Sequence, residues 1–524
     1  MNSSADQKTK QKAVWERLSA MPTPTLAQLF NGDESRVSKM SQRLEFALGD
    51  AQDGTEPMGL LLDWSKTHLG DDELSAFEDL AEVMGFGAAR EALFGGGIVN
   101  PTEGRAATHG AMRGSGTEAD VEEAGQLLQR MGMLVTAIHE GAFGKVEHLI
   151  HIGIGGSALG PDLAVDALTR DFARVDVHVV SNIDGLALEQ AFAACDPHTT
   201  MIAVASKTFT TTETMTNAAS ALKWLGDNNV GDPSGRVVAL TANPEKAVEW
   251  GVDETRILPF PESVGGRYSL WSSIGFPLAL AIGMEEFTEF LAGAQGMDTH
   301  FRENEGRANG PLLAAFGDLY YSRVRGCQTR AVFAYDERLA LLPDYLQQLE
   351  MESNGKSVTV SGEPVDAPTA AITWGGVGTD AQHAVFQLLH QGTHLIPVDF
   401  IASIAPGDEL NPAHHKALLA NCFAQGAALM AGGNMSEGGE DPARGFAGDR
   451  PSATILVDDL DAATLGALIA FHEHRVFAGA VLMGINPFDQ FGVELGKKMA
   501  KEVESGEGDF DASTKALMEA AGLG

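Results

Sequence analysis

Short apolar strands alternate with helix-length segments twice along this chain. The strands are expected at residues 146–151, 175–180, 201–205 and 237–240 in the first series, and at residues 331–334, 370–374, 395–398 and 454–457 in the second. Strands separated by helices at this spacing are typical of right-handed crossovers, which make parallel sheets with helices on both faces. The sequence therefore predicts an α/β protein with two tandem doubly wound parallel-sheet domains.

The length also requires more than one core. A chain of 524 residues exceeds the size at which a single hydrophobic core keeps growing. We expect a helical N-terminal segment over residues 1–99 that packs on the second domain, α/β domains over 100–285 and 286–503, and a C-terminal tail over 504–524.

Charge and cysteine content exclude several classes of protein. The net charge of −36 argues against nucleic-acid binding, which needs a surplus of Lys and Arg. The three cysteines are far apart and odd in number, so neither a disulfide framework nor a structural zinc site is expected, and a reducing, cytoplasmic location fits best. The apolar segment 464–485 is interrupted by His-Glu-His-Arg at 472–475, which predicts a buried helix and no membrane span.

Two loops of the first predicted domain carry residues that suit a phosphate group. Residues 153–158 follow the first strand and include Gly156 and Ser157, and residues 206–214 follow the third strand. Ligands of parallel sheets lie beyond the carboxyl ends of the strands, where glycines admit the ligand and helix N-termini attract anions. The second loop adds a cation and several hydroxyls, namely Ser206, Lys207, Thr208 and Thr211. We expect a monophosphate pocket, although such hydroxyls also simply cap helices.

A dinucleotide site is the main competing interpretation of the first loop. Residues 153–158 formally fit the G-x-G-x-x-A fingerprint. That fingerprint also needs an acid at the end of the second strand, which here runs into Ser181 and Asn182, while Asp176 lies at its beginning. An NAD-dependent enzyme is therefore disfavoured, and no cofactor is predicted.

Glu352 and Arg267 are candidates for acid–base chemistry. Glu352 follows a helix predicted over residues 343–351 and precedes Ser-Asn-Gly, residues that end helices, so its carboxylate can be aimed into a cleft as a general base. Acids at helix ends are more often simply solvated. Arg267 follows two glycines and can point its guanidinium at an oxyanion.

Several longer motifs carry a family resemblance. Residues 262–275, Glu-Ser-Val-Gly-Gly-Arg-Tyr-Ser-Leu-Trp-Ser-Ser-Ile-Gly, and residues 486–498, Asn-Pro-Phe-Asp-Gln-Phe-Gly-Val-Glu-Leu-Gly-Lys-Lys, resemble the two signature regions of the glucose-6-phosphate isomerase family. Residues 206–211, 351–356, 382–383 and 390–393 resemble further family segments in the same order, and the similarity extends from about residue 100 to 501. Thr212 and His394 depart from the pattern, where Gln and Lys are expected.

The resemblance implies a role for each matching residue. Glu352 would carry a proton from C2 to C1 of the open sugar through a cis-enediolate, which Arg267 would stabilise, while His383 and Lys497 would open the ring. It further implies a homodimer in which His383 reaches the partner's site, with no metal. The residues expected to bind the hexose 6-phosphate are Gly156, Ser157, Ser206, Lys207, Thr208, Thr211, Gln348 and Gln490.

Other assignments remain open at this point. From the residues alone, His383 fits an ordinary helical histidine, and Lys497 fits an i,i+3 ion pair with Glu494. A related isomerase that tolerates mannose 6-phosphate, or a non-catalytic sugar-phosphate sensor, would use the same scaffold. A sensor would not need Glu352, Arg267, His383 and Lys497 together.

Overall fold

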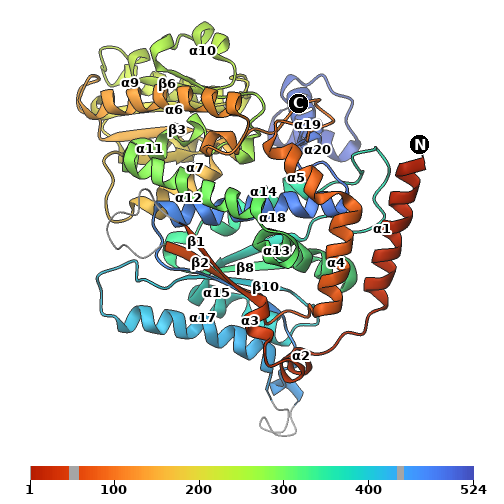
Figure 1. Ribbon diagram of the computed structural model, residues 1–524. Coiled ribbons are helices and arrows are strands. Elements are labelled where there is room, and N and C mark those ends of the chain that lie inside the picture. The colour runs from red at the N-terminus through yellow and green to blue at the C-terminus, as the bar shows by residue number, and fades with distance from the viewer. Residues whose placement is uncertain (1, 47–57, 434–441, 524) are drawn as a thin grey trace.

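The computed structural model describes residues 2–46, 58–433 and 442–523 and contains two sheets (Figure 1). The first sheet is entirely parallel, with the strand order β4-β3-β5-β6-β7. Its strands are β3 (His148–Ile152), β4 (Asp176–Val180), β5 (Thr200–Ala205), β6 (Val237–Thr241) and β7 (Ile257–Pro259). The four strands expected here are confirmed, and β7 is an addition of only three residues. The order reverses between β3 and β5, which is where ligands bind in doubly wound sheets.

Helices cover both faces of this first sheet. Along β5, Ile202 and Val204 face a core that includes helices α8, α9 and α10, whereas Met201 and Ala203 face the larger core shared with the rest of the protein. This alternation is the two-residue period of a strand buried on both sides. The helices of this half are α6 (Glu118–His139), α7 (Leu159–Thr169), α8 (Gly185–Ala194), α9 (Thr212–Asp227), α10 (Pro244–Trp250) and α11 (Phe276–Ile282).

The second sheet has six strands in the order β1-β2-β11-β10-β8-β9. The parallel strands are β8 (Thr329–Tyr335), β9 (Ile372–Val377), β10 (Val398–Ser403) and β11 (Ser452–Val457). The strand expected at 395–398 is wrongly placed, because β10 begins at Val398. Pro397, which has no N–H to donate to a neighbour, directly precedes it.

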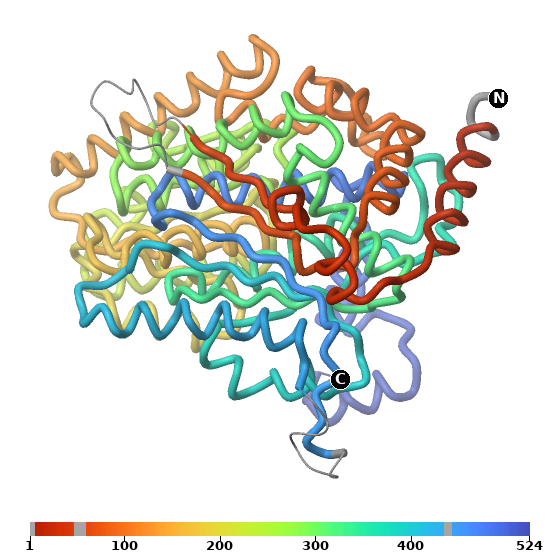
Figure 2. Tube along the Cα trace, turned by 60° about the horizontal axis from the view of Figure 1, so that its bottom comes forward, coloured from red at the N-terminus to blue at the C-terminus, as the bar shows by residue number. Residues whose placement is uncertain are grey.

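The N-terminal segment is not purely helical, which corrects the expectation for residues 1–99. Strands β1 (Ser41–Phe46) and β2 (Met58–Asp63) form an antiparallel pair, and β2 extends the second sheet by pairing with β11. Figure 2 shows these red strands beside the blue strand β11. The sequence of a short apolar run such as residues 58–63 is compatible with a helix or a strand. Here the run is a strand because it pairs with β11, almost 400 residues away in the sequence. The boundaries at residues 99, 285 and 503 stay predictions.

The remaining helices include the longest apolar helix of the described chain. They are α1 (Asn2–Ala20), α2 (Leu26–Gly32), α3 (Arg36–Met40), α4 (Asp71–Met84), α5 (Phe86–Phe94), α12 (Met284–Glu303), α13 (Gly310–Leu319), α14 (Leu342–Asn354), α15 (Gly378–Ala384), α16 (Phe386–Gln391), α17 (Ala413–Ala431), α18 (Ala462–Met483), α19 (Glu494–Ser505) and α20 (Ala512–Ala521). By length and composition α18 is the one helix among the described residues that could cross a membrane, yet 94% of its apolar window is buried inside the protein. It crosses the centre of the molecule in Figure 1, as expected of a buried helix.

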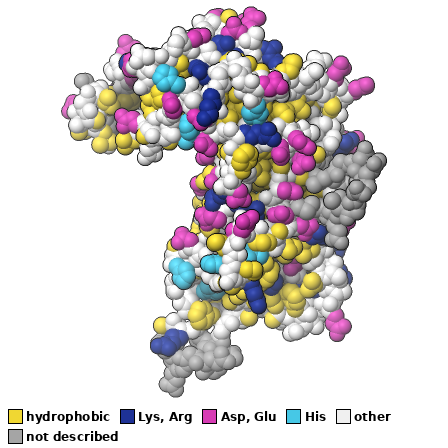
Figure 3. Space-filling view, turned by 90° about the vertical axis from the view of Figure 1, so that its left-hand side faces the viewer, with side chains coloured by type: hydrophobic (Ala, Val, Ile, Leu, Met, Phe, Trp, Pro, Cys, Tyr) yellow, Lys and Arg dark blue, Asp and Glu magenta, His cyan; other side chains and the backbone are white. Residues whose placement is uncertain are grey.

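Acidic side chains are distributed over the surface rather than gathered at one place. In the view of Figure 3, Asp and Glu appear on both the upper and the lower part of the face. The large negative charge is therefore a general property of this face, and any anion site must be locally positive against it.

Candidate active site

Glu352 lies in the last turn of α14, which continues to Asn354 before Gly355 ends it. The expected position of the acid just beyond the helix is thus wrong by one turn. Gln348, one turn earlier on the same face, donates from Nε2 to Oε2 of Glu352 at 2.9 Å. On the other side of the carboxylate, Arg267 Nη1 lies 3.4 Å from Oε2. The Glu352 side chain is only 20% exposed, so its charge is partly shielded from water.

The Arg267 guanidinium is held on every side. It lies in the short turn η6 (Gly266–Tyr268), is 1% exposed, and donates from Nε to Ser353 Oγ at 2.6 Å. Nη1 donates to Gln490 Oε1 at 3.0 Å, and Nη2 donates to the carbonyl oxygens of Pro487 and Asp489. A buried, fully oriented cation beside a carboxylate can stabilise negative charge that develops on a substrate without first reorganising.

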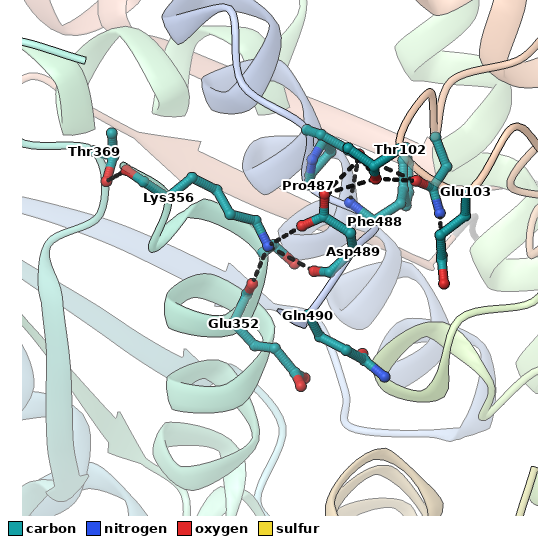
Figure 4. A network of polar contacts seen from close by, with 12 residues as sticks. Thr102, Glu103, Glu352, Lys356, Thr369, Pro487, Phe488, Asp489 and Gln490 are labelled. Carbon is teal, nitrogen blue, oxygen red and sulfur yellow. Dashed lines mark hydrogen bonds and ion pairs between the residues drawn. The ribbon is translucent and has the colours of Figure 1, made fainter. Parts of the chain in front are cut away.

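Lys356 ties the Glu352 helix to the segment that carries Gln490. Its ammonium group donates to the Glu352 carbonyl oxygen at 2.9 Å and to the Asp489 carbonyl oxygen at 2.6 Å, and it pairs with Asp489 Oδ1 at 2.9 Å. Figure 4 shows this bridge, with the side chains of Glu352 and Gln490 extending away from it in the same direction. Burial lowers the Lys356 pKa, although Asp489 opposes the shift.

The second carboxylate oxygen of Asp489, which does not pair with Lys356, is also held by hydrogen bonds. This oxygen, Oδ2, accepts hydrogen bonds from Thr102 Oγ1 at 2.8 Å and Asn486 Nδ2 at 2.9 Å. Sequence reasoning gave no role to Lys356, Asp489 or Thr102. The only local signal was the i,i+4 spacing of Lys356 from Glu352, since Lys356 and Asp489 are 133 residues apart.

The first phosphate loop lies against the Arg267 turn. A Cβ atom on Gly156 would meet the carbonyl carbon of Gly266 at 2.1 Å and the amide nitrogen of Arg267 at 2.4 Å, so only glycine fits there. Gly155 has φ of +57°, and a Cβ on it would lie 3.0 Å from Gln348 Nε2. The loop that contains Ser157 is therefore in close contact with both the Arg267 turn and α14.

The second phosphate loop is linked to the same turn through Lys207. The Lys207 ammonium donates to the carbonyl oxygens of Glu262 at 2.6 Å and Val264 at 3.1 Å. Burial, with a contribution from Arg105, lowers the pKa of Lys207 to about 8. Hydroxyl groups pair within the loop, Ser206 with Thr211 at 3.0 Å and Thr208 with Thr210 at 2.8 Å.

A cavity of about 930 Å³ opens over α14, large enough for a small-molecule ligand. Of the predicted site residues, Gln348, Glu352 and Gln490 line it, and Thr102, Lys356 and Asp489 join them. The loop of residues 153–158 adjoins this cavity where Gly155 lies against Gln348. Neither phosphate loop contributes to the lining of the cavity, nor does Arg267.

His383 and Lys497 are not brought to this cavity within one chain. His383 is exposed on α15, and Lys497 is exposed on α19, where it pairs with Glu494 at 3.0 Å. That ion pair is the ordinary i,i+3 contact expected from the residues alone. The structure thus brings Glu352, Arg267, Gln348 and Gln490 together, but leaves His383 and Lys497 outside the cavity.

The fold and this geometry define an α/β protein with a ligand-sized cavity, which is lined by the carboxylate of Glu352 and lies next to the buried guanidinium of Arg267. The sequence profile described as phosphoglucose isomerase matches residues 63–518. The chain therefore belongs to the phosphoglucose isomerase family.

Individual relatives agree with this assignment. The chain is 72% identical over 510 residues to the glucose-6-phosphate isomerase of Erythrobacter litoralis, covering 97% of this chain and 98% of that one. It is 58% identical to the glucose-6-phosphate isomerase of Zymomonas mobilis, over 97% of each chain. The crystal structure of a glucose-6-phosphate isomerase from Chlamydia trachomatis superimposes with a TM-score of 0.87 at 28% identity, covering 98% of both chains.

Proposed function

We propose that this protein interconverts D-glucose 6-phosphate and D-fructose 6-phosphate, as an isomerase of glycolysis and gluconeogenesis. The observation that carries the proposal is the Glu352–Arg267 pair, with 3.4 Å between Oε2 and Nη1, in which Glu352 lines a cavity of about 930 Å³ that can admit a hexose phosphate. Relatives that share most of this sequence bear the name of that enzyme. The enzyme is assigned to the cytoplasm, where glycolytic substrates are.

The proposed central step is a proton transfer within the opened sugar. Glu352 removes the proton from C2, and the electron pair of that C–H bond moves to form the cis-enediolate, whose oxygen faces the Arg267 guanidinium. Glu352 then returns the proton to C1 while the hydroxyl proton of O2 moves to O1, which yields the ketose. Arg267 lowers the energy of the enediolate by electrostatic attraction, and Gln348 orients the carboxylate through its hydrogen bond to Oε2.

The phosphate group and the sugar chain are assigned to the flanking loops. Lys207 supplies a cation to the phosphate, together with hydroxyl and backbone N–H donors. Gln490, which points in the same direction as Glu352, is assigned to the sugar hydroxyls. The loop residues proposed for the phosphate are Gly156, Ser157, Ser206, Lys207, Thr208 and Thr211.

Ring opening is assigned to His383 and Lys497. Since His383 is exposed on its own chain, the proposal requires a homodimer in which the histidine of one subunit enters the cavity of the other. Lys497 lies on α19, which follows directly from the cavity-lining residues 490–493. A monomeric form would then bind sugar phosphate but turn over the closed ring poorly.

A coupled assay with both hexose phosphates, without added metal or nucleotide, tests the proposal. Conversion in both directions by the wild type, and its loss in Glu352→Gln, is the expected result. Folded protein that binds hexose phosphate without turning it over would instead identify a sensor. Parallel assays with mannose 6-phosphate test whether the site tolerates inversion at C2.

A further inference from the structure

Three potential metal ligands meet at the edge of the first sheet, away from the candidate active site. They are His148, the first residue of β3, His178 in β4, and Cys195, which caps the end of α8. His148 Nδ1 lies 3.5 Å from His178 Nε2, and one ligand atom from each of the three side chains lies within 4.8 Å of the other two. Within the described ranges no other group of three His, Cys, Asp or Glu side chains is this close.

The topology explains why these residues meet. In the parallel pairing of β3 with β4, His148 stands opposite Asp176, so His178, two residues later, has its side chain on the same face. Helix α8 packs on that face through Leu188 and Ala191 and runs back toward the amino end of the sheet, where it delivers Cys195. The two histidines are 30 positions apart in the sequence, so no compact motif of metal ligands reveals the cluster.

The donor set suits a borderline-soft ion. Two imidazoles and a thiolate are common zinc ligands, and two nitrogens bound to one tetrahedral zinc at about 2.1 Å are about 3.4 Å apart. The observed separation of 3.5 Å is close to that value. Asp176 Oδ2 lies 3.9 Å from His148 Nδ1, and its side chain is largely exposed. A rotation of this side chain would make its carboxylate the fourth ligand, and otherwise a water molecule can occupy the fourth position.

We propose that His148, His178 and Cys195 bind a zinc ion, with Asp176 or water as the fourth ligand. The site lies at the amino end of β3, and the loop of residues 153–158 lies at the other end, about 16 Å away for a five-residue strand. The ion therefore takes no part in the proton transfer. It fixes the end of α8 to the edge strand β4, so it stabilises this half of the protein.

All three side chains are partly buried, so an ion between them is partly shielded from solvent. Cysteine binds zinc as the thiolate, so binding releases the thiol proton and the affinity for zinc increases with pH.

Metal titration of the full-length, tag-free protein tests the proposal. After dialysis against a chelator, the protein is titrated with Co²⁺ and, separately, with Zn²⁺. We expect one equivalent of Co²⁺ to produce a thiolate-to-cobalt charge-transfer band, and Zn²⁺ to displace it and raise the melting temperature. Isomerase activity should be the same with and without the ion.

Two variants and two controls decide the ligand set. Cys195→Ser should abolish the charge-transfer band, and His178→Ala should weaken Zn²⁺ binding at least tenfold, both with unchanged circular dichroism. Cys422→Ser, which removes a buried thiol from α17, and the surface variant His414→Ala/His415→Ala should leave both signals intact. A wild type without the band, or a band that persists in Cys195→Ser, would overturn the proposal and leave a hydrogen-bonded histidine pair beside a free thiol.

Discussion

Arg267 Nη1 lies 3.4 Å from Glu352 Oε2, and the same guanidinium donates to Ser353 Oγ, the residue that follows Glu352 on the helix. One arginine thus touches both the candidate base and the backbone element that carries it. The helix end and the arginine turn are fixed relative to each other before any substrate enters, which is the preorganisation that proton transfer to and from carbon requires.

Replacement of Arg267 by lysine should impair catalysis more than binding. A lysine keeps the charge but cannot contact Glu352, Ser353 and Gln490 together, because it lacks the planar fork of donors. We expect kcat to fall roughly 10²-fold or more with a small change in KM. Steady-state kinetics check this, with Arg170→Lys on the surface of α7 as a control that should behave as wild type. Equal losses in both variants would contradict the assignment.

Loss of the positive charge of Lys207 at alkaline pH should lower kcat/KM. Its pKa is lowered to about 8, so the cation is present below that pH and is lost as the pH rises through it. We therefore expect kcat/KM of the wild type to decline above about pH 8, through KM. Lys207→Ala should have a raised KM at neutral pH and lack this alkaline limb. A pH profile that is the same in both proteins would exclude Lys207 as the phosphate cation.

Gly156→Ala should displace the Arg267 turn. The new Cβ would lie 2.1 Å from the Gly266 carbonyl carbon. This clash cannot be relieved by rotation of a side chain, so the backbone of one of the two loops has to move. A displacement near 1 Å costs about 10²-fold in rate when it separates reacting groups, so we expect a loss of that order in kcat/KM. Gly125→Ala on α6, where a Cβ meets nothing within 4 Å, is the matched control. Wild-type kinetics in Gly156→Ala would show that the contact is unimportant.

Asp298→Ala should destabilise the protein without touching the cavity. Asp298 and Glu473 both pair with the buried Arg113, and His474 Nε2 lies 2.6 Å from Asp298 Oδ1, so the network joins α12 to α18. Removing one partner of a buried pair costs about 3–5 kcal/mol, which for a chain of 524 residues corresponds to a fall in melting temperature of roughly 3–5 °C. The exposed pair Arg170–Asp166 offers the control Asp166→Ala, with about 0–1 kcal/mol expected. Thermal unfolding followed by circular dichroism distinguishes the two.

Much of the fold follows from local sequence patterns. Strands such as β5 and β6 are short, apolar and bounded by helices, so their period and length identify them without any tertiary information. Strands β1, β2 and β7 were not predicted, because their own sequences lack a clear strand pattern. They become strands through pairing with neighbouring strands of the sheets. Residues 378–391 likewise form two short helices, α15 and α16, with Val385 between them.

The candidate site divides in the same way. Glu352 and the two phosphate loops are visible from a helix end and from strand exits, because local geometry places them, whereas Gln348 was predicted only through the family resemblance. The Lys356–Asp489 bridge and the contact of Gly156 with Gly266 join segments more than 100 residues apart, which no local pattern encodes. The place of His383 depends on a second subunit in our proposal, so a single chain cannot present it to the cavity.

The most direct test of the central claim is hydrogen exchange at C2 of the sugar phosphate by Glu352→Gln in D₂O. The amide retains the shape of the carboxylate but cannot accept the proton, while Gln348, Arg267 and the phosphate loops are left in place. We predict that NMR detects binding of glucose 6-phosphate to this variant, with no deuterium incorporated at C2 under conditions in which the wild type exchanges that hydrogen fully. Substantial exchange or turnover by Glu352→Gln would contradict the assignment of Glu352 as the base.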